Sequence, residues 1–183
     1  MKNVFKYSLV ALLAFGACKS NAKKEEIFED KLMECTYNSF EDKGNAMKQL
    51  IEDYENQLIR ENVLLSKEGA SYLALYKIIG RGEDFINYPS KSFLTYVKEM
   101  GVKKNLKGLQ LCEQVAYQDE ALYNKSTLKK LQAIRKEMTQ QVDLSPQWVA
   151  SRMLTVFEPS DFDHDYYKLK AFLLFDTFTE AKK

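Results

Sequence analysis

The sequence predicts an all-α fold, a single irregular bundle of seven or eight short helices. Apolar residues recur at helical spacing along nearly the whole chain beyond about residue 27, as expected for helices with one buried face. The 183 residues include only seven Gly and three Pro, which disfavours a β-sandwich with its many turns. This length, with 45% hydrophobic residues, suits one domain, and no Pro- or Ser-rich linker divides it.

Helix start and stop residues divide the first part of the domain into four predicted helices. Gly44 is expected to end the first helix, and Ser66 to cap the third at its N-terminus. Gly80-Arg81-Gly82 supplies a stop for the third helix, while Pro89 and Ser90 open the fourth. The predicted spans are about 27–40, 47–59, 66–79 and 89–100.

Four more helices are predicted in the second part of the domain. Ser126 is the expected N-cap of one of them. Ser145-Pro146 is expected to start the next, because Pro fits the first helical turn without losing a hydrogen bond, and Pro159 to end it. The last helix is apolar on most of its circumference and is therefore predicted to lie in the centre of the bundle. The predicted spans are about 106–116, 126–138, 146–157 and 163–179.

The N-terminus has the pattern of a secretory leader. Lys2 and Lys6 form a short positive segment before an apolar run over residues 9–15, and this run is too short to span a bilayer. Gly16-Ala17-Cys18 then resembles the lipobox of bacterial lipoproteins. The resemblance implies that residues 1–17 are a cleaved signal peptide and that acyl chains such as palmitate are attached to Cys18. Residues 18–26 would then be a lipidated polar tether, and 27–183 the helical domain. An ordinary signal-peptidase site and an uncleaved anchor are the alternatives.

The residues after Cys18 bear on the location of an anchored protein. In lipoprotein sorting of the proteobacterial type, Asp after the lipidated Cys is an inner-membrane retention signal, and this chain has Lys19 there. The resemblance therefore implies a lipid-anchored place in the cell envelope, with the outer membrane favoured over the inner. Lys24-Glu25-Glu26 resembles the signal of some surface lipoproteins, so periplasmic and surface-exposed orientations both stay open.

Two thiols remain once Cys18 is lipidated. In an oxidising compartment Cys35 and Cys112 are a candidate disulfide, whose loop of roughly 77 residues would contribute about 4 kcal/mol in the chain-entropy model. Both residues also fall in phase with apolar stripes, so two buried reduced thiols are the alternative.

An acidic run, Asp161-Phe162-Asp163-His164-Asp165, precedes the last predicted helix. Its alternating carboxylates are similar to those of a Ca²⁺ loop, but the Gly and the Glu that such a loop requires later are both missing. Asp161 or Asp163 is therefore expected to cap the last helix. His164, the only histidine, is expected to be exposed and inert. We predict no metal site, no catalytic residue and no cofactor.

The net charge of +1 argues against a nucleic-acid partner, but basic residues cluster on one predicted helix. They are either its solvated face or a contact for anionic lipid heads or an acidic partner. Three further lysines lie upstream, at 103, 104 and 107. The basic residues of the helix and of the segment just before it are Lys125, Lys129, Lys130, Arg135 and Lys136.

The sequence carries no Gly-rich phosphate loop, no Gly-x-Ser-x-Gly elbow and no Cys-x-x-Cys pair, so an enzyme is disfavoured. The leading hypothesis is a non-enzymatic, membrane-anchored envelope lipoprotein that acts as a protein-binding accessory, assembly or inhibitor component. The alternative is a periplasmic carrier or sensor that holds an apolar small molecule between its helices. An exposed apolar patch rimmed by charge would favour the first hypothesis, and a large apolar cavity the second.

Overall fold

The described part of the chain is built from helices, as predicted. The computed structural model describes residues 27–83, 88–100, 112, 117–140 and 144–180, which contain eight α-helices, one 3-10 helix and no strand. The all-α class is therefore confirmed, while the leader, the tether and nearly all of the helix predicted over 106–116 lie outside these residues. The elements are α1 (Phe28–Asn38), α2 (Asn45–Arg60), α3 (Gly69–Arg81), α4 (Phe93–Glu99), α6 (Glu120–Lys125), α7 (Thr127–Met138), α8 (Pro146–Met153), the 3-10 helix η1 (Pro159–Asp163) and α9 (Asp165–Glu180).

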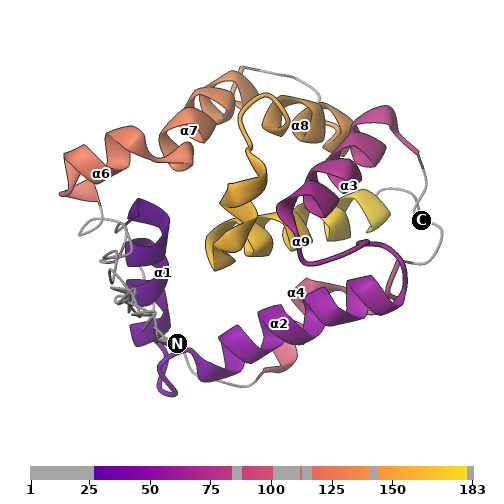
Figure 1. The fold of residues 1–183 in the computed structure, drawn as a ribbon, viewed down its shortest axis with the longest axis horizontal. Helices are drawn as coiled ribbons and strands as arrows, with labels where there is room; N and C mark the ends of the chain where they lie inside the picture. The colour runs from indigo at the N-terminus through magenta and orange to yellow at the C-terminus, as the bar shows by residue number, and fades with distance from the viewer. Residues whose placement is uncertain (1–26, 84–87, 101–111, 113–116, 141–143, 181–183) are drawn as a thin grey trace, which may run out of the picture.

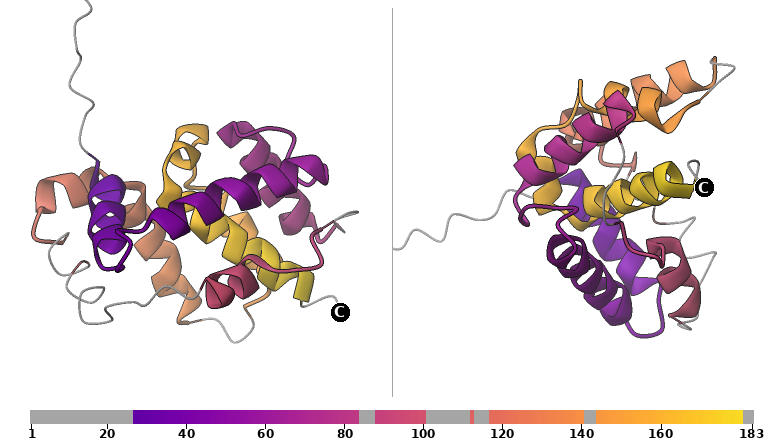
Figure 2. Two further views of the ribbon diagram at one scale, coloured as in Figure 1. Left: turned by 90° about the horizontal axis from the view of Figure 1, so that it is seen from below. Right: turned by 90° about the vertical axis from the view of Figure 1, so that its right-hand side faces the viewer.

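Helix α9 lies between two layers of helices (Figure 1). Seen from the side, α3, α7 and α8 lie on one side of it, and α2 and α4 lie on the other (Figure 2). Helix α9 packs against α3 and α8 from the first layer, against α2 and α4 from the second, and also against α1. The prediction that the last helix is central is confirmed.

The core around α9 is largely aromatic. Phe172 and Phe175 of α9 are completely buried. The centroid of the Phe172 ring lies 5.1 Å from that of Tyr54 on α2 and 5.2 Å from that of Phe93 on α4. Phe175 makes an edge-to-face contact with Tyr76 on α3, at 5.5 Å between centroids. Ring contacts of this kind add stability beyond the area that they bury, so one apolar helix joins both layers.

Several helix boundaries lie where the sequence predicts them. The Ser126 hydroxyl caps α7 by accepting a hydrogen bond from the Lys129 N–H at 3.2 Å. The Ser145 hydroxyl caps α8 in the same way, with the Trp148 N–H at 3.2 Å. Gly82 ends α3 with a φ of 73°, in the left-handed region that favours glycine. These signals are local, which is why the sequence alone reveals them.

Other boundaries differ from the prediction. Helix α4 is capped by Ser92 and not opened by Pro89 and Ser90, because Phe93, the first residue of the helix, packs in the core. Ser66 does not cap α3, whose N-cap residue is Glu68. Helix α8 ends at Met153, well before the proline that was expected to stop it, and that proline begins η1 instead.

Gly69 lets the start of α3 approach η1 closely. A Cβ atom at this position would lie 1.8 Å from the Pro159 carbonyl oxygen, a backbone atom that cannot rotate away. We expect Gly69→Ala to lower the free energy of unfolding, measured in urea, by about 1–3 kcal/mol or more, since the two elements must separate. Gly80→Ala is the matched control, because the one close contact of its Cβ would be the Ser151 hydroxyl, at 2.8 Å, on a side chain that can turn. Equal losses in the two variants would contradict this explanation.

Candidate binding site

Three carboxylates are buried among the described residues: Glu29 is 3% exposed, Glu55 2% and Asp176 4%. Burying an ionised group is costly unless hydrogen bonds or opposite charges compensate it. The partners of each carboxylate therefore distinguish a structural role from a binding role.

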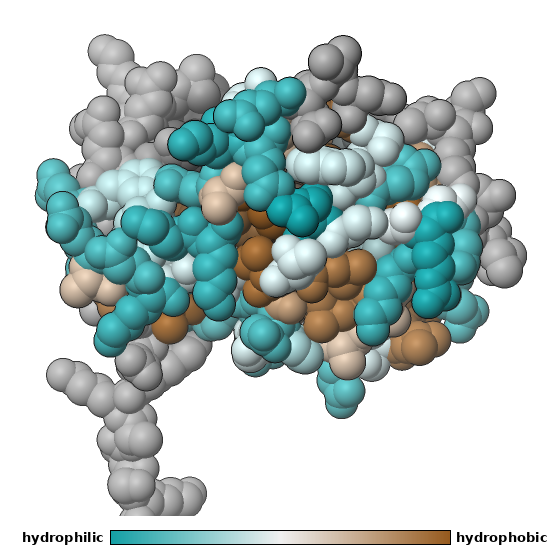
Figure 3. Space-filling view, turned by 90° about the horizontal axis from the view of Figure 1, so that it is seen from above, coloured by the Kyte–Doolittle hydropathy of each residue, from teal (hydrophilic) through white to brown (hydrophobic). Residues whose placement is uncertain are grey.

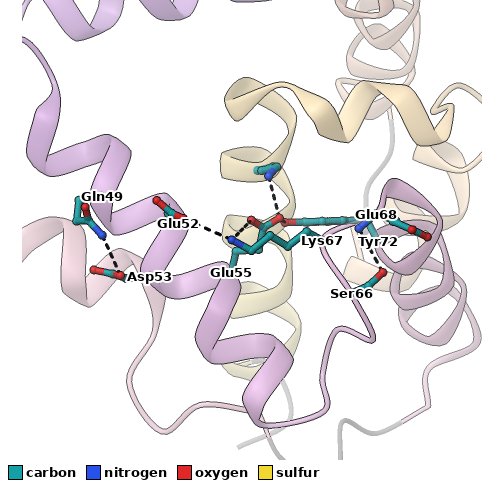
Figure 4. A network of polar contacts seen from close by, with 9 residues as sticks. Gln49, Glu52, Asp53, Glu55, Ser66, Lys67, Glu68 and Tyr72 are labelled. Atoms are coloured by element: carbon teal, nitrogen blue, oxygen red, sulfur yellow. Dashed lines mark hydrogen bonds and ion pairs between the residues drawn. The ribbon is translucent and has the colours of Figure 1, made fainter.

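Glu55 of α2 is fully engaged within the protein. Its Oε1 accepts hydrogen bonds from the Tyr72 hydroxyl at 2.7 Å and from the Lys168 ammonium at 2.8 Å. Lys67 approaches its Oε2 to 3.9 Å, and the side chains of Lys67 and Tyr72 both reach toward Glu55 (Figure 4). Because these partners come from α3, α9 and the loop between α2 and α3, Glu55 joins the two layers and has a structural role.

Asp176 of α9 is engaged through both oxygens. Its Oδ1 accepts hydrogen bonds from the hydroxyls of Tyr54 at 3.0 Å and Tyr88 at 2.7 Å. Its Oδ2 accepts one from the Leu94 N–H at 3.0 Å, in the first turn of α4. This carboxylate therefore holds α2 and α4 against α9.

Glu29, in the first turn of α1, differs from the other two. Its Oε1 accepts hydrogen bonds from the Tyr167 hydroxyl and from the Leu128 N–H, the latter at 3.1 Å. Its Oε2 has no hydrogen-bond partner among the described residues. Burial and the bond to Glu29 raise the pKa of Tyr167 far above its ordinary value, so this hydroxyl stays protonated and keeps donating. Glu29 is thus a fixed, buried carboxylate with one oxygen unused.

A pocket of about 200 Å³ opens beside Glu29. It lies where the first turns of α1, α7 and α9 meet η1 and the end of α6. Asp161 is a second carboxylate in its wall, and burial raises the pKa of Asp161, with the Glu29 charge acting in the same direction. The lining residues are Ile27, Phe28, Glu29, Leu122, Lys125, Ser126, Thr127, Ser160, Asp161, His164 and Tyr167.

The acidic run contributes to this pocket in a way that the sequence analysis did not predict. The expectation that His164 is exposed is wrong: its side chain is 17% exposed, and its Nδ1 lies 2.8 Å from Asp30 Oδ1. Nor does Asp161 cap the last helix, because its carboxylate accepts the Glu158 N–H at 2.7 Å and so caps η1. Asp163 is not the cap either: it ends η1, and α9 begins two residues later. Among the described residues no group of three or more His, Cys, Asp or Glu side chains is arranged to hold a metal ion.

The structure brings Cys35 and Cys112 together as a disulfide. Their Sγ atoms are 2.06 Å apart and their Cα atoms 5.5 Å apart. Cys112 belongs to a second, smaller apolar cluster with Phe28 and Leu32 of α1. The disulfide therefore holds α1, whose first turn lines the pocket, against a residue 77 positions further along the chain. Cys18, the predicted lipidation site, lies outside the described residues.

The predicted basic residues Lys125, Lys129, Lys130, Arg135 and Lys136 are all exposed, and we call them the basic surface. Helix α7 buries only Ile134 of its own residues. Its one acidic residue, Glu137, is ion-paired with Arg152 of α8 at 2.5 Å, so it does not offset the basic surface. No carboxylate of the described chain forms an ion pair with the five cations. The lysines at 103, 104 and 107 lie outside the described residues.

Sequence reasoning missed Glu29 and Tyr167. An acidic residue in a first helical turn is ordinarily explained by the helix dipole, and the stripe read from Phe28 and Leu32 leaves Glu29 outside it. Helix α1, however, also buries Glu29, Met33 and Tyr37, which follow one another every four residues. That second stripe was the available signal, because it places a carboxylate on a buried face.

Two further observations bear on function. Within the described residues no helix has the length and apolar character needed to cross a bilayer. A fold by itself does not specify a function, whereas a surface or a pocket carries the chemistry that does. Comparison with protein-family models, with curated proteins and with solved structures finds no match to this chain.

Proposed function

We propose that the protein is a non-enzymatic, lipid-anchored component of the bacterial cell envelope that binds an acidic protein through the basic surface. The observation that carries the proposal is that α7 buries one residue and exposes several cations, and that the carboxylates of the described residues form no ion pair with these cations. Complementary charge steers association and selects the partner.

A protein partner is favoured over a membrane surface as the target of α7. A helix that lies in a membrane interface inserts an apolar face between the lipids. The large apolar side chains Leu131 and Ile134 of α7 point toward the interior instead, since Ile134 is buried and Leu131 packs against the core. In Figure 3, which views the side of the molecule where α7 and α8 lie, apolar residues gather in a central area bordered by hydrophilic ones. Such an apolar area with a polar rim is typical of a protein interface.

The location in the envelope rests on the leader and on the cysteines. Disulfides persist in oxidising compartments and are rare in the cytosol, so a Cys35–Cys112 bond agrees with export. The proposed role is non-enzymatic because the sequence carries no Gly-x-Ser-x-Gly elbow and no Cys-x-x-Cys pair. The pocket beside Glu29 has two carboxylates in its wall, and an apolar ligand there would leave them unsolvated, which speaks against an apolar carrier.

Affinity capture tests the partner. The tagged full chain is crosslinked in intact cells and recovered from membranes, next to Lys129→Glu/Lys136→Glu and the control Lys77→Glu/Lys98→Glu. Lys77 and Lys98 are exposed lysines of α3 and α4, so the control has the same net charge. We expect the wild type and the control to recover the same acidic protein, and the α7 variant to lose at least nine-tenths of it.

The same variants separate a protein partner from lipid. Each is mixed with vesicles that contain anionic phospholipid, and the fraction that sediments with them is measured. A loss of vesicle binding specific to the α7 variant, with unchanged protein capture, would contradict the proposal and assign the basic surface to the membrane.

Lipidation is tested by labelling cells with a fatty acid that carries a detectable tag. We expect the wild-type chain to be labelled and Cys18→Ala to be unlabelled, because the thiol is the acceptor of the lipid in the family that the leader resembles. Cys35→Ala/Cys112→Ala is the control and should label like the wild type. Equal labelling of Cys18→Ala would exclude the anchor.

A further inference from the structure

We infer that the pocket beside Glu29 binds a primary alkylammonium group, carried either by a small free amine or by a lysine side chain. The pocket adjoins the basic surface, since Lys125 belongs to both. The inference rests on the carboxylate of Glu29, and its test changes none of the basic residues, so it does not depend on the proposed partner of α7.

The charge of the pocket points to a cation. An ionised carboxylate offers about four acceptor positions on its two oxygens, and Glu29 uses only Oε1, for Tyr167 and Leu128. Its Oε2 has no hydrogen-bond donor in the described structure, although Glu29 is only 3% exposed. A charged donor forms the strongest hydrogen bond with such an oxygen.

The protein itself does not neutralise this charge. Lys125 is the one lysine or arginine in the lining; it is exposed and forms no ion pair with either wall carboxylate. His164 is occupied by Asp30, and Lys130 acts on Asp161 only through space. The two hydrogen bonds to Oε1 hold the Glu29 carboxylate in place, so little ordering is needed when a ligand binds.

The shape of the pocket selects the class of cation. Its volume of about 200 Å³ is below the about 300–1,000 Å³ of pockets that hold drug-sized ligands, so it suits a short chain. Ile27, Phe28 and Leu122 supply apolar wall for methylene groups, while the Ser160 hydroxyl offers a further acceptor. A guanidinium would need two unused carboxylate oxygens side by side for its fork, and a quaternary ammonium has no N–H to donate. A primary ammonium can donate an N–H to the single unused oxygen of Glu29, and its alkyl chain can contact the apolar wall.

The test is a titration of the full chain, purified in a non-ionic detergent, followed by NMR. The probes are n-butylamine for the free-amine source, N-acetyl-lysine amide for the lysine source, and tetramethylammonium as a cation without N–H groups. We expect saturable binding of at least one of the first two, and at least tenfold weaker binding of tetramethylammonium. Whichever of the two binds identifies the source.

Glu29→Gln removes the charge but keeps an amide oxygen that can accept the bonds from Tyr167 and Leu128. We expect it to weaken amine binding at least tenfold while retaining a cooperative thermal transition. Should Glu29→Gln fail to fold, Ser160→Arg tests the same site, because Ser160 is exposed at the pocket and the added cation competes with the ligand. Thr177→Arg, at an exposed position of α9, is the matched control and should bind like the wild type. Absence of amine binding to the folded wild type, or equal affinities in the wild type and in the folded pocket variants, would overturn the inference.

Discussion

Raising the pH to 11 is expected to lower the free energy of unfolding by about 7 kcal/mol. Five tyrosines of the described part of the chain are buried. Burial is the largest cause that raises the pKa of each in the folded state far above the ordinary value of about 10. In the unfolded chain the same side chains lose their protons near pH 10. The five residues are Tyr37, Tyr54, Tyr72, Tyr76 and Tyr167.

The direction of the effect follows from these two states. A group whose folded pKa is raised contributes its full stability below the unfolded pKa and loses it as the pH rises above that value. At pH 11 each of these tyrosines lowers the free energy of unfolding by about 1.4 kcal/mol. The reason is that this pH lies about one unit above its pKa in the unfolded chain, where it ionises, while it stays protonated in the folded protein. Five such groups together lower the free energy of unfolding by about 7 kcal/mol. The free energy of unfolding of a whole domain is only about 5–15 kcal/mol.

Urea unfolding at pH 7, 9, 10 and 11 measures this loss, with helicity read by circular dichroism. Tyr76→Phe is the informative variant, because the buried Tyr76 hydroxyl has no hydrogen-bond partner among the residues that the structure describes. Removing it should stabilise the protein at pH 7 by about 1–3 kcal/mol, the usual cost of an unsatisfied buried polar group, and by about 1.4 kcal/mol more at pH 11. Stability that stays constant between pH 9 and 11 would contradict the assignment of these tyrosines to the interior.

The features that the sequence predicted correctly are those set by neighbours along the chain. The caps at Ser126 and Ser145 depend on an amide three residues away, and the stop at Gly82 depends on its own φ. The central place of α9 follows from its own apolar circumference. Where two signals compete, as Ser90 and Ser92 do before α4, the packing of Phe93 decides, and this packing is not local.

The pocket was not predictable in the same way. Glu29 takes its hydrogen bonds from residues 99 and 138 positions further along the chain, and His164 contacts a carboxylate 134 positions before it. Nothing in the residues next to Glu29 or His164 specifies these partners. The residue types were visible, but their pairing depends on α9 turning back to lie against α1.

Removing α9 is expected to abolish folding. A chain that ends at His164 loses four aromatic side chains that are at most 1% exposed: Tyr167, Phe172, Phe175 and Phe178. Burying such a side chain contributes about 1.5–3 kcal/mol, so the loss is about 6–12 kcal/mol, comparable to the stability of a whole domain. Two polar partners disappear as well, because Glu55 loses Lys168, and Tyr54 loses Asp176.

Circular dichroism decides the outcome, since the truncated chain should show no cooperative thermal transition, whereas a chain that ends at residue 180 should melt like the full one. A point variant gives a graded version of the test. Phe172→Ala should lower the free energy of unfolding by about 3–5 kcal/mol, and Thr177→Ala, on the exposed side of the same helix, by less than about 0.5 kcal/mol.

Limited proteolysis of the intact protein gives a second measurement. Cleavage at Lys168, which is partly buried and bound to Glu55, should be slow relative to cleavage at the exposed Lys77. A truncated chain that stays folded would instead make α9 a detachable arm. Its row of phenylalanines would then be available to a partner, and the two layers of helices would have to be held together without it.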